Sequence, residues 1–236
     1  NTPDIKVITG IRRSGKSVLL KQFVDYLKVA EPECNIIQIN LQDMDFGKLL
    51  DYKALHEYAI STNKSNCHNV LVIDEVQLCK NFETAINSLH SKQIFDIYIT
   101  GSNAFLLSSD LATLFTGRTM EVKVFPFSFA EFKAFENKSE NIQDSFEAYV
   151  KTGGMPGSYV YSDVRQRLNY VKDVYETILL RDLVQKYNIR NKEELLKIAM
   201  FLMDNVSNLS SPNNICNTLN IDGSSITRKT VSSYIE

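Results

Sequence analysis

The sequence lacks any long apolar run. None of its hydrophobic stretches approaches the ~18–20 residues that a membrane-spanning helix needs. Of its 236 residues, 44% are hydrophobic, and the formal net charge is -2. This near-neutral charge excludes a protein that coats nucleic acid over its whole surface, although it is compatible with one local basic face. We expect one full hydrophobic core with a smaller attached unit, and no membrane partner.

Cysteine and histidine are scarce and scattered. No two cysteines form a C-x-x-C pair, and the residues concerned are Cys34, Cys67, Cys79, Cys216, His56, His68 and His90. This spacing favours reduced thiols over a disulfide framework or a zinc site, and each histidine is expected to lie on the surface or in packing. No stretch typical of a signal peptide precedes the first apolar run. Together these features predict a cytoplasmic protein.

Short β-branched runs alternate with stretches of helical periodicity in the first half of the chain. The runs predicted as strands are Ile5–Thr9, Asn35–Asn40, Val70–Asp74, Asp96–Thr100 and Met120–Val124. Between the first two, apolar residues at helical spacing predict a helix that covers one face of the sheet: Leu19, Leu20, Phe23 and Leu27. Because the strands are almost continuously apolar, both faces should be covered. The pattern predicts an α/β fold, with a parallel sheet flanked by helices.

Helical patterns dominate the rest of the chain. An amphipathic helix is predicted from the spacing of Leu168, Val171, Tyr175, Ile178 and Asp182, and a second over residues 193–206. A helix-turn-helix pattern follows, with Pro212 at its first helix, Ile215 and Leu219 on one face, Gly223 in the turn, and Val231 and Ile235 on the second helix. We therefore predict a core domain over residues 1–145. Residues 146–236 should form a helical linker and a helix-turn-helix or winged-helix unit.

The segment Gly10–Ser17 fits the pattern G-x-x-x-x-G-K-[ST], with a predicted strand before it and a helix after it. Glycines let such a loop curl so that its N–H groups face phosphate oxygens. Lys16 would reach the β- and γ-phosphates, and the hydroxyl of Ser17 would coordinate Mg²⁺. The alternative is a glycine-rich turn that binds nothing, which the complete signature disfavours. The residues expected around the nucleotide are Gly10, Arg13, Ser14, Gly15, Lys16, Ser17 and Val18, although the side chains of Arg12 and Arg13 need not touch it.

Two carboxylates follow the third predicted strand. Asp74 could hold Mg²⁺ together with Ser17, and Glu75 could act as general base toward the attacking water. An Asp-Glu pair also occurs at ordinary helix N-termini, but its pairing with the P-loop favours catalysis. After the fourth strand, Ser102 and Asn103 could contact the γ-phosphate or orient water, or could cap a helix.

Five linked segments carry a family resemblance: "ITGIRRSGKSVLLKQF", "LVIDEVQ", "YITGSNAFLLSSDLATLFTGR", "VFPFSFAEF" and "GGMP". Together they resemble a bacterial and archaeal family of AAA+-superfamily ATPases near the STAND-like branch. The resemblance implies an ATPase domain that binds ATP or ADP with Mg²⁺, followed by a helical and winged-helix region. In that family an uncharacterised domain with a nuclease-like fold usually follows.

The resemblance also implies roles for single residues. Ser102 or Asn103 would be the first sensor, and Arg118 an arginine finger directed at its own or a neighbour's γ-phosphate, unless it forms a salt bridge. Pro156 in Gly153–Pro156 would pack beside the nucleotide, as in the G-x-P feature of STAND proteins, unless the segment is a plain turn. Arg181 is a weaker candidate for a second sensor.

Two functions are compatible with these features. The first is a Mg²⁺-dependent ATPase whose nucleotide state repositions its helical C-terminal part. The second is a slow switch that binds DNA or a protein through its winged helix. The second predicted helix of that unit offers Ser224, Ser225, Thr227, Arg228 and Lys229, but only two positive charges, which favours a packing role over DNA reading. A small-molecule kinase is disfavoured because Glu75 suits hydrolysis by water. The protein is also expected to be able to form oligomers.

Overall fold

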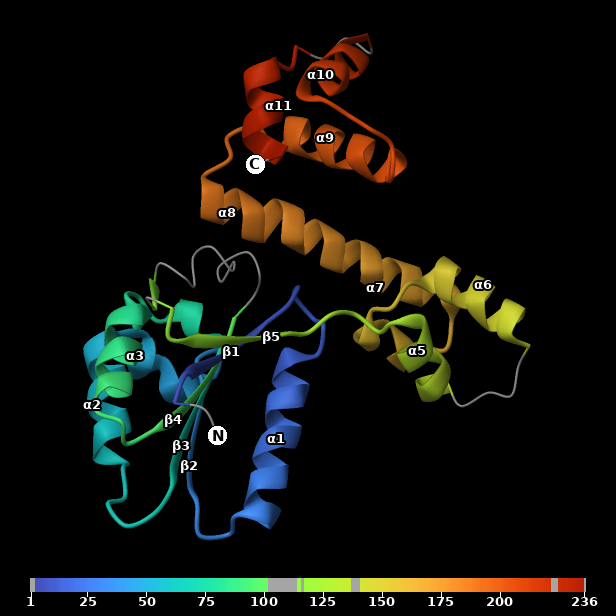
Figure 1. Cartoon of the computed structure of the whole chain (residues 1–236). Coiled ribbons are helices and arrows are strands. Elements are labelled where there is room, and N and C mark those ends of the chain that lie inside the picture. The colour runs from blue at the N-terminus through green and yellow to red at the C-terminus, as the bar shows by residue number, and fades with distance from the viewer. Residues whose placement is uncertain (1–2, 102–113, 116, 137–140, 222–224, 236) are drawn as a thin grey trace. The chain divides into compact units, whose positions relative to one another are not determined.

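The computed structural model describes residues 3–101, 114–115, 117–136, 141–221 and 225–235 (Figure 1). Its centre is a sheet of five strands with the order β2-β3-β4-β1-β5, in which every pair is parallel. The strands are β1 (Ile5–Thr9), β2 (Asn35–Asn40), β3 (Asn69–Asp74), β4 (Asp96–Thr100) and β5 (Thr119–Lys123). The five predicted strands are therefore confirmed, with shifts of at most one residue at the bounds of β3 and β5. The parallel sheet gives the molecule a carboxyl edge, where all strands end, and an amino edge, where all strands begin.

Helices cover both faces of this sheet. Helix α1 (Lys16–Ala30) packs on one face through a cluster of Ile8, Leu20, Val24, Leu27, Val70 and Val72. Helices α2 (Tyr52–Ser61) and α3 (Phe82–Ser91) lie on the other face, where a larger cluster includes Ile39, Leu55, Ile73, Ile86 and Phe115 (Figure 1). The predicted α/β class, with a parallel sheet between helices, is confirmed.

The inner face of α1 differs from the prediction at one position. Leu20 and Leu27 are buried as expected, and Phe23 is partly buried, but Leu19 is 40% exposed. Val24 takes part in the core instead, because Leu20, Val24 and Leu27 are spaced four and three residues apart and share one stripe of the helix.

The remaining described elements are mostly helical. Two short 3₁₀ segments, η1 (Met44–Leu50) and η2 (Val76–Leu78), belong to the sheet region. They are followed by α5 (Phe129–Glu136), α6 (Ile142–Thr152), η3 (Pro156–Val160), α7 (Val164–Glu176), the π-helical segment η4 (Thr177–Leu183), α8 (Val184–Tyr187), α9 (Lys192–Asp204), α10 (Pro212–Ile221) and α11 (Arg228–Ile235). No helix in the described ranges combines the length and apolar character that crossing a membrane requires.

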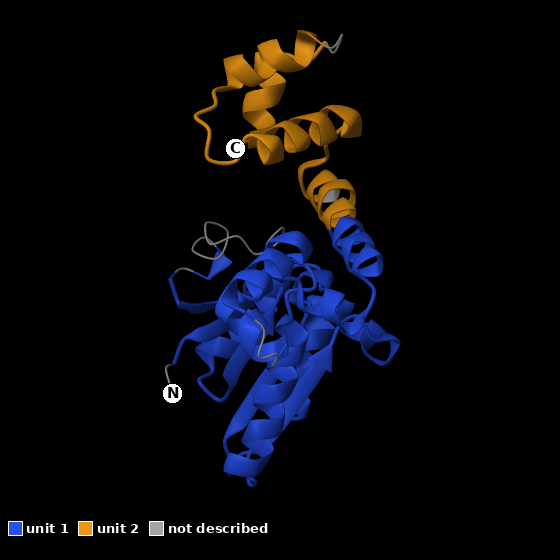
Figure 2. Ribbon diagram, turned by 90° about the vertical axis from the view of Figure 1, so that its right-hand side faces the viewer, with its two compact units in different colours: residues 1–174 blue, residues 175–236 orange. Residues whose placement is uncertain are grey.

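The chain forms two compact units, residues 1–174 and 175–236 (Figure 2). The boundary predicted after residue 145 lies inside α6, and residues 146–174 pack within the first unit. Aromatic contacts explain part of this packing. The ring of Phe132 in α5 contacts those of Tyr149 in α6 and Tyr159 in η3 in tilted arrangements, with ring centroids 5.4 and 5.3 Å apart. That two functional domains meet at residue 145 stays a prediction.

The long predicted helix is present, but a π-helical segment changes its buried face. Helical structure continues without a break from Val164 to Tyr187, with Thr177–Leu183 in the π form. Asp182 is buried as expected, whereas Leu168 is 42% exposed, and Val174 and Leu179 are buried instead. The spacing of five residues between Val174 and Leu179 fits the wider turn of a π-helix rather than the α-helical period.

The second unit contains the predicted pair of short helices. Helices α9, α10 and α11 enclose a small core of Ile198, Ile215, Ile226 and Val231. Pro212 begins α10 as expected, Leu219 is partly buried, and Ile235 is 45% exposed. Gly223 and Ser224 lie outside the described residues, and the winged-helix assignment stays a prediction.

Candidate nucleotide-binding site

The loop Gly10–Ser17 connects the carboxyl end of β1 to the start of α1. Gly10 has φ 155°, and a Cβ at this position would lie 2.3 Å from the carbonyl oxygen of Val124. The chain is held there by the N–H of Val124, which donates to the carbonyl of Thr9 at 2.8 Å. Gly15 has φ 104° and caps α1 in the left-handed region. Glycine is therefore required at both signature positions, once by a close approach and once by the backbone conformation.

The side chains of the loop are arranged as a phosphate cradle requires. Lys16 is buried, and its Nζ donates to the carbonyl oxygens of Gly10 and Ile11, each at 2.9 Å. The Oγ of Ser14 is buried without a hydrogen-bond partner in the described part of the chain. Ser17 and Val18 are exposed in the first turn of α1. An ammonium group and an unsatisfied hydroxyl at a helix N-terminus form a donor set that fits phosphate oxygens.

The two predicted carboxylate residues lie at the same edge of the sheet, and a buried threonine joins the side chain of the first to the backbone of the second. Asp74 ends β3, and Thr100 ends the neighbouring strand β4. The Thr100 hydroxyl donates to Oδ1 of Asp74 and accepts from the backbone N–H of Glu75 at 3.0 Å. Because β4 lies between β3 and β1, Thr100 stands between the carboxylates and the strand that leads into the P-loop.

Glu75 is held in an unusual conformation. Its backbone has φ 58°, in the left-handed region that non-glycine residues rarely adopt. The side-chain amide of Gln77 donates to Oε2 of Glu75. Strained residues of this kind occur often at functional sites, where the surrounding structure fixes them. Thr100 and Gln77 were not identified from the sequence. The sequence feature that could have indicated Thr100 is its position as a polar residue at the end of the apolar run "DIYIT".

Other predicted residues lie apart from this arrangement. Ser102 and Asn103 fall outside the described residues. The carbonyl of Arg118 accepts from the N–H of Ile5 at 2.9 Å, which places Arg118 at the amino edge, where its side chain is exposed. A five-residue strand is about 13 Å long, which exceeds the reach of an arginine side chain. Arg118 therefore lies away from the P-loop of its own chain. A role as a finger directed at the γ-phosphate of a neighbouring chain's nucleotide stays a prediction.

Two glycines, one in the segment Gly153–Pro156 and one directly after it, closely approach other parts of the chain. A Cβ on Gly154 would lie 2.2 Å from the carbonyl oxygen of Phe127, whose N–H donates to the carbonyl of Gly154 at 2.7 Å. A Cβ on Gly157 would lie 2.0 Å from the hydroxyl of Tyr170 in α7. Pro156 begins η3 and is half-buried. Its expected contact with nucleotide stays a prediction.

Tyr170 also contacts the P-loop. The guanidinium carbon of Arg13 lies 5.1 Å from the centroid of the Tyr170 ring, within cation–π range. Arg13 has φ 64°, an unfavourable backbone conformation for a non-glycine residue, and its side chain is exposed. One tyrosine thus contacts both Gly157 and the P-loop. The sequence contained no signal for this contact, because it depends on how α7 packs.

A five-stranded parallel sheet with this loop, lysine and carboxylate arrangement defines a P-loop nucleotide-binding fold. A family model described as "AAA domain" matches residues 2–133, and the chain belongs to this family of AAA+ P-loop ATPases. A second model, a domain of unknown function (DUF8612), matches residues 143–236. The recognition of an AAA+ ATPase family from the sequence is thereby confirmed. The STAND-like placement and the nuclease-like companion domain stay predictions.

Similar proteins come from bacteria and archaea. An uncharacterized protein of Haemophilus influenzae is 34% identical over 243 residues, covering 100% of this chain and 60% of the relative. The uncharacterized protein MJ1544 of Methanocaldococcus jannaschii is 28% identical over 248 residues, covering 98% of this chain and 54% of the relative. The chain thus spans little more than half the length of these relatives.

Two solved structures illustrate the wider similarity. AMPPCP-bound DnaA from Aquifex aeolicus has a TM-score of 0.45 and 16% identity, covering 99% of this chain and 80% of DnaA. PCH-2 of C. elegans has a TM-score of 0.43 and 14% identity, covering 77% of this chain and 63% of PCH-2. Similarities this weak say nothing about ligands, so function is inferred from the site itself.

Proposed function

We propose that the chain binds ATP with Mg²⁺ at the carboxyl edge of its sheet and hydrolyses it with water. The observation that carries this proposal is the hydrogen-bonded group of Asp74, Thr100 and Glu75 beside a complete P-loop. A P-loop alone suits many phosphate ligands. A second carboxylate next to the metal-binding aspartate adds a group that can accept a proton from water.

Lys16 and the loop amides would bind the phosphates. In the structure the ammonium of Lys16 donates to two loop carbonyls, so binding exchanges these bonds for charge-assisted ones to phosphate oxygens. Ser17, exposed in the first turn of α1, and Asp74 would hold Mg²⁺, which when bound neutralises charge on the phosphate oxygens. Thr100 would keep the Asp74 carboxylate directed at that position.

Glu75 would orient the attacking water and accept its proton. Its backbone N–H is fixed by Thr100 and its carboxylate by Gln77, so both ends of the residue are held before substrate arrives. Such preorganisation lowers the reorganisation needed at the moment of reaction.

The test is phosphate release by the purified chain with Mg²⁺-ATP, compared between wild type and Glu75→Gln. We expect the Glu75→Gln variant to retain nucleotide binding and to hydrolyse ATP ~10²–10⁴-fold more slowly, because this is the usual contribution of a general base. Glu83→Gln in the first turn of α3 is the matched control and should leave the rate unchanged. An unchanged rate in Glu75→Gln would remove this residue from the chemistry.

A second function, a nucleotide-controlled switch, is supported by the contacts of Tyr170. This residue joins the P-loop, through Arg13, to α7, and helical structure continues from α7 through the π segment into residues 175–236. The side chains of Arg228 and Lys229 are exposed at the start of α11 and could meet DNA, but two charges suit a protein partner better. Tight retention of ADP without turnover would favour the switch over the ATPase.

A further inference from the structure

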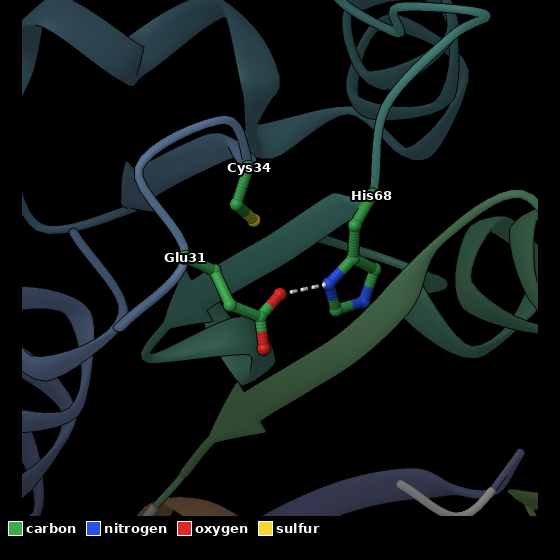
Figure 3. A group of neighbouring side chains, drawn as sticks. All are labelled: Glu31, Cys34 and His68. Atoms are coloured by element: carbon green, nitrogen blue, oxygen red, sulfur yellow. Dashed lines mark hydrogen bonds and ion pairs between the residues drawn. The ribbon is translucent and has the colours of Figure 1, made fainter. Parts of the chain in front are cut away.

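We propose that Glu31, Cys34 and His68 form a Zn²⁺ site at the amino edge of the sheet, on the opposite side from the P-loop. Among the described residues these three side chains form a group in which the candidate ligand atoms all lie within 4.8 Å of one another (Figure 3). Oε2 of Glu31 lies 2.8 Å from Nδ1 of His68. The site is independent of the proposed ATPase activity.

The backbone holds the three residues in place. Glu31 caps α1, with its N–H donating to the carbonyl of Leu27 at 2.8 Å, and the N–H of Cys34 donates to the carbonyl of Glu31 at 2.9 Å. The N–H of Asn35 donates to the carbonyl of His68 at 2.8 Å, where β2 and β3 begin to pair. The turn that carries Glu31 and Cys34 is thereby fixed against the residue that carries the imidazole.

The chemistry of the ligand set suits zinc. A thiolate, an imidazole and a carboxylate are the three ligand types that Zn²⁺ takes from proteins, with bonds of about 2.0–2.3 Å. Tetrahedral bonds of that length require ligand atoms about 3.3–3.8 Å apart. Oε2 of Glu31 and Nδ1 of His68, at 2.8 Å, must therefore move apart, and any pair separated by more than this range, up to 4.8 Å, must move closer. The Glu31 and His68 side chains are 45% and 36% exposed, so rotation of the glutamate can supply that movement. Binding would release the thiol proton of Cys34 to solvent.

A second carboxylate supports the imidazole from the other side. Oδ2 of Asp96 lies 3.8 Å from Nε2 of His68. Asp96 is in turn ion-paired with Lys6 and accepts from the hydroxyl of Tyr98 at 3.1 Å. Metal-bound histidines usually direct their second nitrogen at a carboxylate, which fixes the tautomer and strengthens the ligand. In this arrangement Nδ1 of His68 faces the metal position and Nε2 faces Asp96.

Three protein ligands leave one coordination position for water or a further ligand. A surface pocket of about 590 Å³, lined in part by Cys67, His68 and Asp96, opens beside the group. Solvent can therefore reach the metal position, as in zinc sites that exchange their fourth ligand.

The test uses Co²⁺ as a spectroscopic substitute for Zn²⁺, with the purified wild-type chain in the absence of nucleotide. We expect one equivalent of Co²⁺ to produce a thiolate-to-cobalt charge-transfer band, and Zn²⁺ to displace it. Cys34→Ser should abolish the band. Glu31→Gln, which retains a hydrogen-bonding group beside His68, should weaken Zn²⁺ binding at least ~10-fold.

Cys216→Ser and His56→Ala are matched controls, since both residues lie outside the group. They should bind Zn²⁺ as wild type does, and so should Lys16→Ala, which removes only the nucleotide site. Absence of the charge-transfer band at equimolar Co²⁺ would overturn the proposal. So would equal Zn²⁺ affinity in wild type, Cys34→Ser and Glu31→Gln, because the three side chains would then form only a hydrogen-bonded surface cluster.

Discussion

The two edges of the sheet are built from the same strands but by different means. At the carboxyl edge the backbone is distorted, and positive φ angles occur at Gly10, Arg13, Gly15 and Glu75. At the amino edge positive φ angles also occur, at Gln93 and Gly117, but Glu31, Cys34 and His68 have negative φ angles and are fixed by ordinary turn and strand hydrogen bonds. The candidate phosphate site thus depends on backbone conformation, whereas the group of Glu31, Cys34 and His68 depends on side chains that meet on an ordinary backbone.

This difference explains why the P-loop could be recognised from the sequence, whereas the group of Glu31, Cys34 and His68 could not. A distorted backbone needs glycines at fixed spacing, so the P-loop is visible as a pattern. Side chains that meet across a sheet edge need no special residues between them, and Glu31 and His68 are 37 positions apart in sequence. The comparison predicts that changes in the P-loop, Asp74 and Glu75 alter nucleotide chemistry, and that changes in Glu31, Cys34 and His68 do not.

The largest effect is expected for Lys16→Ala. Removing the buried ammonium eliminates the charge-assisted bonds to phosphate, so Mg²⁺-ATP affinity should fall at least ~1000-fold, or about 4 kcal/mol. Isothermal titration measures this directly. Lys21→Ala, an exposed lysine of the same helix, is the control and should bind as wild type does. Unchanged affinity in Lys16→Ala would reject the P-loop assignment.

Arg118→Ala tests whether the amino edge of one chain completes the carboxyl edge of another. If Arg118 acts as a finger in an oligomer, its removal should preserve binding and slow hydrolysis by about 10³-fold. Mixing Arg118→Ala with Lys16→Ala should then restore activity, because some mixed interfaces combine an intact P-loop with an intact arginine. A normal rate in Arg118→Ala, or no recovery on mixing, would contradict a role in trans.

Thr100→Val removes the hydroxyl that joins Asp74 to the backbone of Glu75. Leaving these partly buried groups without their partner should cost about 1–3 kcal/mol and slow ATP hydrolysis roughly 10- to 100-fold. Steady-state phosphate release measures the effect. Thr62→Val provides the matched control, because its hydroxyl donates to the carbonyl of Tyr58 at the end of α2. Equal rates for the two variants would show that Thr100 does not support the site.

Tyr170→Leu removes the ring beneath Arg13. An exposed cation–π contact contributes about 0.5–1 kcal/mol, so ATP or ADP affinity should change about two- to fivefold. Fluorescence titration with labelled nucleotide can resolve this shift. Tyr26→Leu, an exposed tyrosine of α1, should leave affinity unchanged. Equal nucleotide affinities in Tyr170→Leu and Tyr26→Leu would argue against energetic coupling between the P-loop and α7.

The smallest effect is expected for His68→Gln, which should leave ATP affinity and phosphate release within about twofold of wild type. His68 lies at the start of β3 and Asp74 at its end, so the substitution removes no group near the P-loop. A large loss of hydrolysis with normal thermal stability would show that the two edges are coupled.

The sheet was predictable because its strands are short, apolar and separated by helical patterns. The P-loop residues and the pair Asp74 and Glu75 were predictable because their spacing follows from phosphate and metal chemistry. Thr100 was not predicted, since one threonine at a strand end is common and only the β3–β4 register makes it a partner of Asp74. Leu19 was wrongly predicted to be buried. Val18, Leu19 and Leu20 are all apolar, and only Leu20 lies on the buried face of α1.

Arg118 shows a different limit. The resemblance implied an arginine finger, with a salt bridge as the alternative, and left open whose nucleotide a finger would face. The pairing of β5 with β1 places Arg118 away from the P-loop of its own chain. The π segment at Thr177–Leu183 was also invisible, because α- and π-helices use the same residue types. From the sequence, Cys34 was predicted to be a reduced thiol and His68 a surface or packing residue, because nothing in the sequence placed the two residues together.

Amide hydrogen exchange with and without Mg²⁺ and a non-hydrolysable ATP analogue tests the central claim most directly, because it observes both edges in one measurement. We predict slower exchange in peptides that cover Gly10–Val18 and Asp74–Gln77, and no change in peptides that cover Glu31–Asn35 and Lys64–Asn69. Protection at the amino edge, or none in the P-loop, would contradict the assignment of nucleotide binding to the carboxyl edge.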